Sequence, residues 1–235
     1  MLTESDKIWL SKNYPSLSCS ESDEISGIAK FSATYNEQTG LFLVLNNHTE
    51  NTVGGLRIDV SFAINIKETN NKSISKLPAL YIDGIEGIPD RHFHQTANDR
   101  RACLCSPFIE DQFLVPNFKF QKYFEELVLP FLYGQAFYTT NKRWPWQEWS
   151  HGCVGLLEAY IIEANPTKTK ECIDILRSQS DWLLIKTVVT QKTPIKGHIY
   201  CFCKSGNRIR NCHVDAWKGV EQLRQDIKIK GIVIS

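Results

Sequence analysis

The chain has 235 residues, of which 42% are hydrophobic and 23% charged, and its formal net charge is +1. This composition is ordinary for a globular protein that buries a core. The small net charge creates no strong field toward nucleic acid or an anionic membrane. No apolar run approaches the roughly 18 residues that a membrane span needs, and the first residues lack the basic-then-apolar order of a signal peptide. We therefore expect a cytoplasmic protein that binds neither a membrane nor nucleic acid directly.

The chain is rich in cysteine for a protein without a secretion signal. Its eight cysteines are Cys19, Cys103, Cys105, Cys153, Cys172, Cys201, Cys203 and Cys212. In a chain of this length, metal binding or catalysis is a more common use for them than disulfides. Cys153 and Cys172 lie on apolar faces of expected helices, so we assign these two to the core.

The N-terminal half has the pattern of a sheet. After a short helix over residues 4–14, strands are expected over residues 28–35 and 41–45. The clearest signal is residues 56–66, where every second residue is apolar, so that one face of the strand is buried. Short polar connections favour an antiparallel meander, and we expect four strands. Residues 75–99, with their prolines and glycines, are expected to be irregular chain.

The second half has helical spacing. Helices are expected from Pro107 onward, through Cys153 to Ile161, and over residues 170–182. The fold class is therefore α+β. We expect a main domain at residues 1–190 and a cysteine-rich extension at residues 191–235.

The extension contains the strongest motif of the sequence. Cys201 and Cys203 form one close pair of ligands, and Cys212 and His213 form a second pair. Structural zinc binds four such ligands in a tetrahedron, commonly as two pairs that a turn brings together. Gly206 lies where the chain must reverse direction, and glycine tolerates the backbone angles of a tight turn. We expect these four residues to hold one structural zinc ion.

The same segment, CFCKSGNRIRNCH, resembles the SEC-C motif, in which Cys-x-Cys-x-Ser-Gly is followed by basic residues and Cys-His. The resemblance covers this tail alone. It implies a small zinc-binding module that often serves as a docking piece at the end of an unrelated domain.

A second motif follows the expected strands, in the segment RHFHQTANDRRACLCSPF. It resembles the ubiquitin-conjugating enzymes, and more closely their bacterial relatives. In that family a histidine-containing stretch leads through an aspartate to the active cysteine and a leucine. The matching residues are His92, Asp99, Cys103 and Leu104. Downstream, WPWQEWSHG is similar to a stretch of the bacterial conjugating enzymes found in antiviral cyclic-nucleotide operons.

The resemblance implies that Cys103 accepts an acyl group as a thioester. Such a cysteine must be partly exposed and must ionise readily, and the transient oxyanion needs a hydrogen-bond donor. The eukaryotic family has a His-Pro-Asn triplet near the cysteine, whereas this chain has His92-Phe93-His94. The hydrogen-bond donor to the oxyanion is therefore not assigned, and Asn98, His94 and a backbone amide are the candidates.

Three other interpretations of these residues remain. Cys103 and Cys105 can be small buried residues beside surface histidines. Alternatively, His92, His94, Cys103 and Cys105 have the spacing of a second zinc site, because residues two apart on extended chain point the same way. Finally, Cys105 can be the nucleophile in place of Cys103.

The tryptophan-rich stretch contains Trp144, Trp146 and Trp149. Clustered aromatic residues mark some recognition surfaces, but these can equally cover the core. Glu148 and His151 are an acid–base pair or, more simply, residues that cap the following helix.

From these motifs we expect a ubiquitin-conjugating-like cysteine transferase with structural zinc as its metal. By resemblance, its acyl donor is the C-terminus of a cyclic-nucleotide synthase, a nucleotidyltransferase, in antiviral defence, and its acceptor is a protein amine. The alternative is a non-catalytic adaptor that has the same fold and docks partners through its zinc tail.

Overall fold

The computed structural model describes residues 2–45, 53–68, 76–84, 101–146, 150–163, 166–193 and 196–234. The chain forms two compact units. Unit 1 comprises residues 1–105 and 110–148, and unit 2 comprises residues 106–109 and 149–235. Within the described ranges, no helix is both long enough and apolar enough to cross a membrane.

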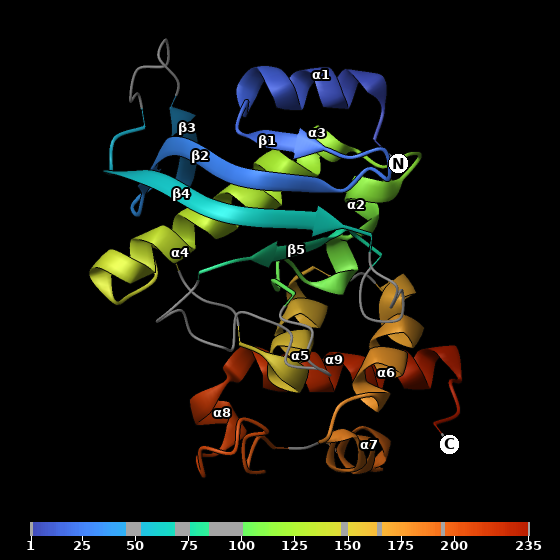
Figure 1. Ribbon diagram of the computed structural model, residues 1–235. Coiled ribbons are helices and arrows are strands. Elements are labelled where there is room, and N and C mark those ends of the chain that lie inside the picture. The colour runs from blue at the N-terminus through green and yellow to red at the C-terminus, as the bar shows by residue number, and fades with distance from the viewer. Residues whose placement is uncertain are drawn as a thin grey trace. The chain divides into compact units, whose positions relative to one another are not determined.

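Unit 1 contains an antiparallel sheet (Figure 1). Its strands are β1 (Leu17–Cys19), β2 (Ile25–Asn36), β3 (Leu41–Leu45), β4 (Leu56–Lys67) and β5 (Ala79–Ile82). The strand order is β1-β2-β4-β5, and β3 pairs with β2 outside this path. The α+β class and the antiparallel sheet are confirmed. The strand over residues 41–45, however, does not lie between β2 and β4 as a meander would require, because β2 pairs directly with β4.

Residues 53–55, which directly precede β4, lie against the end of β2. Thr34 Oγ1 donates a hydrogen bond to the carbonyl of Gly54, and Asn36 Nδ2 donates one to the carbonyl of Val53 at 2.8 Å. Gly55 has a φ of +84°, and a Cβ there would lie 2.1 Å from the carbonyl oxygen of Tyr35. Only glycine permits this approach, so Gly55 lets β4 pair with β2 on the edge that β3 does not use.

Strand β5 lies where irregular chain was expected. Its residues Ala79, Leu80 and Ile82 are buried, and it pairs with β4 between Lys67 and Ile64. A strand of four residues is too short to show an alternating pattern. Pro78 precedes the strand, and proline is tolerated there because it need not donate to the ladder.

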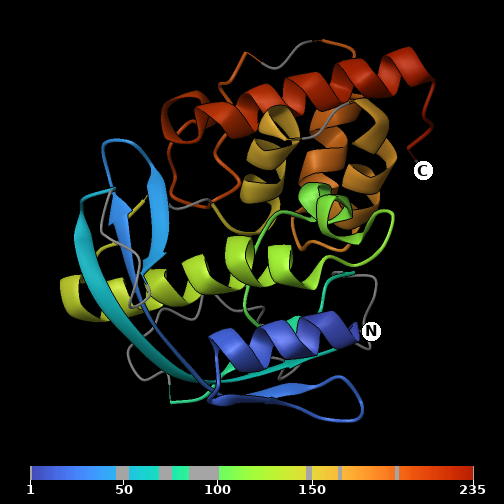
Figure 2. The same cartoon turned by 90° about the horizontal axis from the view of Figure 1, so that it is seen from above.

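The helices of unit 1 cover one face of the curved sheet (Figure 2). They are α1 (Glu4–Asn13), α2 (Asp111–Leu114), α3 (Phe120–Tyr123), the π-helical turn η3 (Phe124–Val128) and α4 (Leu129–Asn141). The Trp9 ring of α1 contacts the rings of Phe120 and Phe124 edge-on. The Tyr133 hydroxyl donates a 2.8 Å hydrogen bond to the Leu56 carbonyl and so joins α4 to β4.

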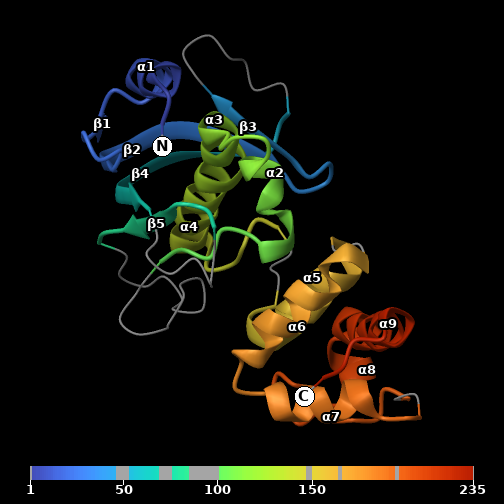
Figure 3. The same cartoon turned by 90° about the vertical axis from the view of Figure 1, so that its right-hand side faces the viewer.

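Unit 2 is helical (Figure 3). Its elements are the 3-10 turns η2 (Pro107–Ile109) and η4 (Pro166–Lys168) and the helices α5 (Gly152–Ile162), α6 (Thr169–Arg177), α7 (Trp182–Thr190), α8 (Ile209–Cys212) and α9 (Val214–Lys230). The single helix expected over residues 170–182 is therefore two helices. The polar residues 178–181 form the turn between them, because such side chains compete for backbone hydrogen bonds.

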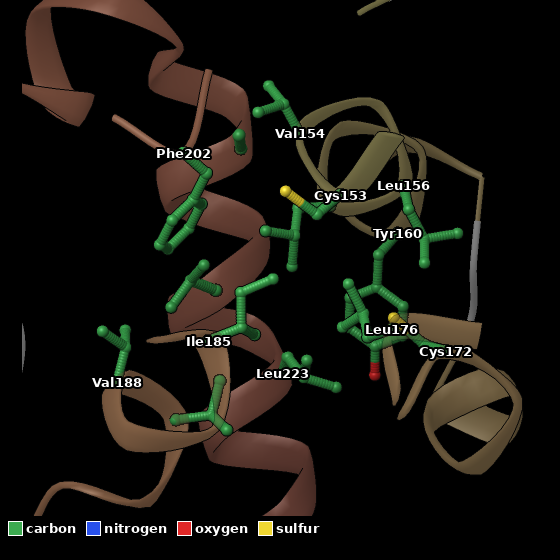
Figure 4. Close-up of a cluster of buried hydrophobic side chains, with 14 of the residues drawn as sticks. Cys153, Val154, Leu156, Tyr160, Cys172, Leu176, Ile185, Val188, Phe202 and Leu223 are labelled. Atoms are coloured by element: carbon green, nitrogen blue, oxygen red, sulfur yellow. The ribbon is translucent and has the colours of Figure 1, made fainter. Parts of the chain in front are cut away.

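One apolar core joins the helices of unit 2, and Figure 4 shows part of it. Cys153 and Cys172 are buried in this core, as expected. Helices α5 and α9 approach closely, because a Cβ on Gly219 would lie 2.0 Å from the carbonyl oxygen of Leu157. The residues of η2 belong to this unit through Phe108, whose ring contacts Tyr160.

The units do not coincide with the expected boundary at residue 190. Phe202 and Ile209, which belong to the cysteine-rich extension, are buried in the same core as residues of α5, α6 and α7. The extension thus shares one apolar core with the preceding helices. It belongs to a helical unit that begins near residue 149, because its apolar side chains pack on the preceding helices.

Candidate functional site

A short hairpin brings the two ligand pairs together. Tyr200 and Arg208 face each other as an antiparallel bridge. The amide of Cys201 donates to the carbonyl of Asn207 at 2.8 Å. The chain reverses through Lys204 and Gly206, which have φ values of 62° and 78°. As a result the Cys201–Cys203 pair faces the end of α8, where the other pair lies.

The four ligand atoms converge. The thiol sulfurs of Cys201, Cys203 and Cys212 and a ring nitrogen of His213 all lie within 4.8 Å of one another. Cys201 Sγ is 3.1 Å from His213 Nδ1, and Cys203 Sγ is 3.5 Å from Cys212 Sγ. Sulfurs bound to zinc at about 2.3 Å form tetrahedral edges of about 3.8 Å. The cluster therefore fits one metal ion of this size once the separations between ligand atoms change by up to about 1 Å.

The electrostatics of the cluster favour one thiolate before any metal binds. Burial opposes ionisation of Cys203. Hydrogen bonds with the hydroxyl and backbone of Ser205, and with the thiols of Cys201 and Cys212, outweigh burial and lower the pKa of Cys203 to about 6. At Cys201, by contrast, burial raises the pKa to about 12. A bound cation deprotonates further thiols, because the thiolate is the form that binds metal.

The packing of the hairpin fixes the positions of the ligands. Phe202, between the first two cysteines, is 3% exposed, and Ile209, three residues before Cys212, is completely buried. Figure 4 shows the Phe202 ring directed into the core of unit 2. Each ligand pair is thus attached to an apolar anchor, and the sequence pattern alone did not reveal either anchor.

The segment that contains Cys103 begins beside the edge of the sheet. The amide of Ala102 donates a 2.8 Å hydrogen bond to the carbonyl of Leu80 in β5. Cys103 and Cys105, which follow, are both half-buried. Burial raises the pKa of the Cys103 thiol, and the positive charge of Arg101 opposes this only in part. The described surroundings of Cys103 therefore favour the neutral thiol over the thiolate.

The other residues expected at this site lie outside the described part of the chain. They are His92, His94, Asn98 and Asp99. The predicted grouping of His92 and Asp99 with Cys103 thus stays a prediction, and so does the second zinc site. Within the described ranges, Cys201, Cys203, Cys212 and His213 form the single cluster of three or more metal-ligating side chains.

Trp144 and Trp146 pack on unit 1. The Trp146 ring lies 6.2 Å from the Tyr133 ring in a stacked arrangement, and the Trp144 ring stacks on Tyr138 at 4.7 Å. A Cβ on Gly134 would come within 2.9 Å of Trp146. This packing favours the interpretation that the two tryptophans cover the core. Trp149 and Glu148 lie outside the described residues, and the His151 side chain makes no capping hydrogen bond to α5.

No protein-family model, curated protein or solved structure matches the chain. Function is therefore inferred from the residues and the geometry of the chain itself.

Proposed function

We propose that the hairpin in unit 2 binds one structural zinc ion through Cys201, Cys203, Cys212 and His213. The convergence of the four ligand atoms carries this proposal. Thiolates select soft or borderline ions, and zinc suits a Cys3His set. All four positions are filled by protein side chains, which is typical of structural sites and not of catalytic ones.

The metal content of the purified protein tests this proposal. We expect about one zinc per chain by elemental analysis, and Cys203→Ser or Cys212→Ser should reduce it to near zero. The matched control is Cys19→Ser, because Cys19 lies in β1 of unit 1 and is not one of the four converging ligands of unit 2. A protein that holds no metal, or that still holds a full equivalent in both ligand variants, would contradict the assignment.

We further propose that unit 1 is a cysteine transferase of the ubiquitin-conjugating type, with Cys103 as nucleophile. The supporting observation is the order of elements: an antiparallel sheet, then a half-buried cysteine beside its edge strand, then helices. By resemblance, the donor is the C-terminus of a cyclic-nucleotide synthase in an antiviral operon.

The proposed chemistry needs few groups. The Cys103 thiolate attacks the carbonyl carbon of an activated protein C-terminus, and the activating group leaves as the thioester forms. The amine of an acceptor protein then attacks the same carbon and releases the thiolate. His92 and Asp99 are the residues proposed to assist, as general base and as a group that orients the segment.

A second candidate function is a non-catalytic adaptor with the same fold. The raised pKa of Cys103 favours it, because a neutral thiol is a poor nucleophile. In this case unit 1 binds partner proteins and the zinc hairpin supplies a docking surface.

Trapping of an adduct separates the two candidates. The chain is incubated with a cyclic-nucleotide synthase as the proposed donor and with an enzyme that activates its C-terminus, and intact masses are recorded. A transferase forms an adduct that hydroxylamine cleaves and that Cys103→Ala abolishes. Cys103→Ser should give a more stable ester, and Cys105→Ala should keep the adduct. If neither the native chain nor any of the three variants forms an adduct, Cys103 is not the nucleophile. The same conclusion follows if Cys105→Ala is the one variant that abolishes the adduct.

A further inference from the structure

The small net charge of the chain conceals two opposite charges. Unit 1 contains 14 lysines and arginines against 18 aspartates and glutamates, whereas unit 2 contains 13 against 8. The excess in unit 2 is concentrated around the metal hairpin. Residues 182–214 include six lysines and arginines and not one aspartate or glutamate. The local field of this segment is therefore strongly positive.

Four side chains of the hairpin form what we call the cationic face: His198, Tyr200, Arg208 and Arg210. His198 and Tyr200 are two residues apart on the first arm and point to one side. Arg208 ends the second arm and Arg210 lies in α8, and both reach this side through contacts with His198. All four are exposed, and Tyr200 is 62% exposed. An apolar residue, Ile209, separates the two arginines and is buried.

Contacts within the cationic face hold its groups together. The Arg208 guanidinium lies 4.3 Å from the centre of the Tyr200 ring, and its Nη1 donates a hydrogen bond to the His198 carbonyl. Arg210 Nη1 lies 3.4 Å from His198 Nε2. The metal ligands and the buried Phe202 fix the hairpin beneath, so this face is ordered before any ligand binds.

The two arginines are not neutralised by the protein. Among the residues that the structure describes, Lys204 pairs with Asp181 and Lys218 pairs with Asp215, but neither Arg208 nor Arg210 forms an ion pair with a carboxylate. Two adjacent guanidinium groups without a counter-ion are well suited to phosphate, which they bind through parallel hydrogen bonds.

We propose that the cationic face binds single-stranded nucleic acid. Arg208 and Arg210 contact successive phosphates, and Tyr200 offers its ring to an unpaired base. An acidic peptide would satisfy the arginines but would make no use of an exposed aromatic ring, whereas proteins that bind single strands combine a basic surface with aromatic rings for stacking. This inference revises the expectation, drawn from the net charge of the whole chain, that no nucleic acid is bound. It does not depend on the reaction at Cys103.

The test is fluorescence anisotropy with the zinc-loaded full chain and labelled thymidine and uridine oligomers of about 20 nucleotides. We expect saturable binding at about 50 mM salt, weaker binding as salt rises, and weaker binding to a duplex of the same length. Arg208→Gln with Arg210→Gln should weaken binding at least about tenfold at this salt. It should also lower the salt slope by about 1.4, because each single-strand phosphate contact contributes about 0.7.

Three further variants separate this site from general attraction. Lys170→Gln with Lys228→Gln removes the same charge from other exposed positions of unit 2 and should change affinity less than about twofold. Tyr200→Leu should weaken binding about tenfold, and Tyr200→Phe should keep it, because a phenyl ring still stacks. Zinc content is measured for every variant, so that loss of the hairpin is not mistaken for loss of a contact.

Three results would overturn the proposal. The first is no saturable binding of either oligomer. The second is an equal loss in the Lys170/Lys228 variant, which would mean nonspecific attraction. The third is binding that ignores Tyr200→Leu and is displaced equally well by polyglutamate, which would assign the cationic face to an acidic protein partner.

Discussion

The hydroxyl of Tyr160 donates a 2.6 Å hydrogen bond to Oδ2 of Asp226, and both side chains are buried in unit 2. Gln222 Nε2 donates to the other carboxylate oxygen at 3.0 Å, and the Thr169 hydroxyl lies 3.0 Å from that of Tyr160. A buried carboxylate is tolerated where such donors satisfy it. Because Tyr160 lies in α5 and Asp226 in α9, this network fixes how the two helices pair.

Removal of the carboxylate should therefore destabilise unit 2. Asp226→Ala leaves the hydroxyl of Tyr160 and the amide of Gln222 without this acceptor, and we expect the free energy of unfolding to fall by about 2 kcal/mol. Urea unfolding measures the change. The control is Asp174→Ala, whose ion pair with Arg177 is exposed and should contribute less than about 1 kcal/mol. Equal effects of the two substitutions would contradict a stabilising role of the network.

The same network predicts a dependence of stability on alkaline pH. Burial, followed by the hydrogen bond to Asp226, raises the pKa of Tyr160 above its ordinary value. The neutral phenol is thus the form that the fold stabilises. Its contribution is complete below the unfolded pKa of about 10 and is lost as pH rises from there toward the folded pKa. We expect the free energy of unfolding to fall more steeply above about pH 10 in the native chain than in Tyr160→Phe. Parallel curves would exclude this contribution.

Sequence reasoning succeeded where the signal was local. Ile25 to Ile66 contains two strands whose apolar residues alternate, and the buried positions Phe31 and Val60 are register partners in the sheet. The four proposed metal ligands were found within thirteen residues because their chemistry and spacing are written in consecutive sequence. One reversal of the chain, between Cys203 and Cys212, is enough to bring the two ligand pairs together.

Sequence reasoning failed where an element is determined by packing against residues that are distant in the sequence. Strand β5 exists because Leu80 packs and pairs with β4, which no window of four residues can reveal. Burial of Phe202 among residues of α5 and α7 joins the hairpin to the preceding helices, and no local pattern near residue 190 reveals this packing. The local charge around the hairpin was visible in the sequence and was lost by averaging over the whole chain.

A pair of glycine substitutions tests the approach of residues 53–55 to the end of β2. Gly55→Ala places a methyl group against the carbonyl of Tyr35 in a left-handed conformation, and we expect a loss of about 3 kcal/mol or more in the stability of unit 1. Gly40 also has a positive φ, of +70°, but a Cβ there meets nothing within 4 Å. Gly40→Ala should therefore cost only about 1 kcal/mol, from the backbone conformation alone. Thermal and urea unfolding should rank the two variants in this order, and a milder effect at Gly55 would mean that the loop relaxes freely.

The reactivity of the cysteines gives the sharpest test of the surroundings of Cys103. With zinc bound to the hairpin thiols, iodoacetamide should label the half-buried Cys103 before Cys153 and Cys172, which are buried. Burial and the nearby Asp181 raise the pKa of Cys153 to about 12, so that residue serves as the slow control. Because burial also raises the pKa of Cys103, its labelling rate should still be increasing between about pH 8 and 9.

Labelling is followed by peptide mass spectrometry, with Cys105→Ala as background so that the two neighbouring cysteines are not confused. A rate that reaches its plateau below about pH 8 would contradict the raised pKa. It would mean that residues outside the described ranges, among them His92 and Asp99, stabilise the thiolate, and it would favour the transferase over the adaptor. A rate that continues to rise would instead require the donor complex itself to activate Cys103, because a thiolate is needed for attack on the acyl group.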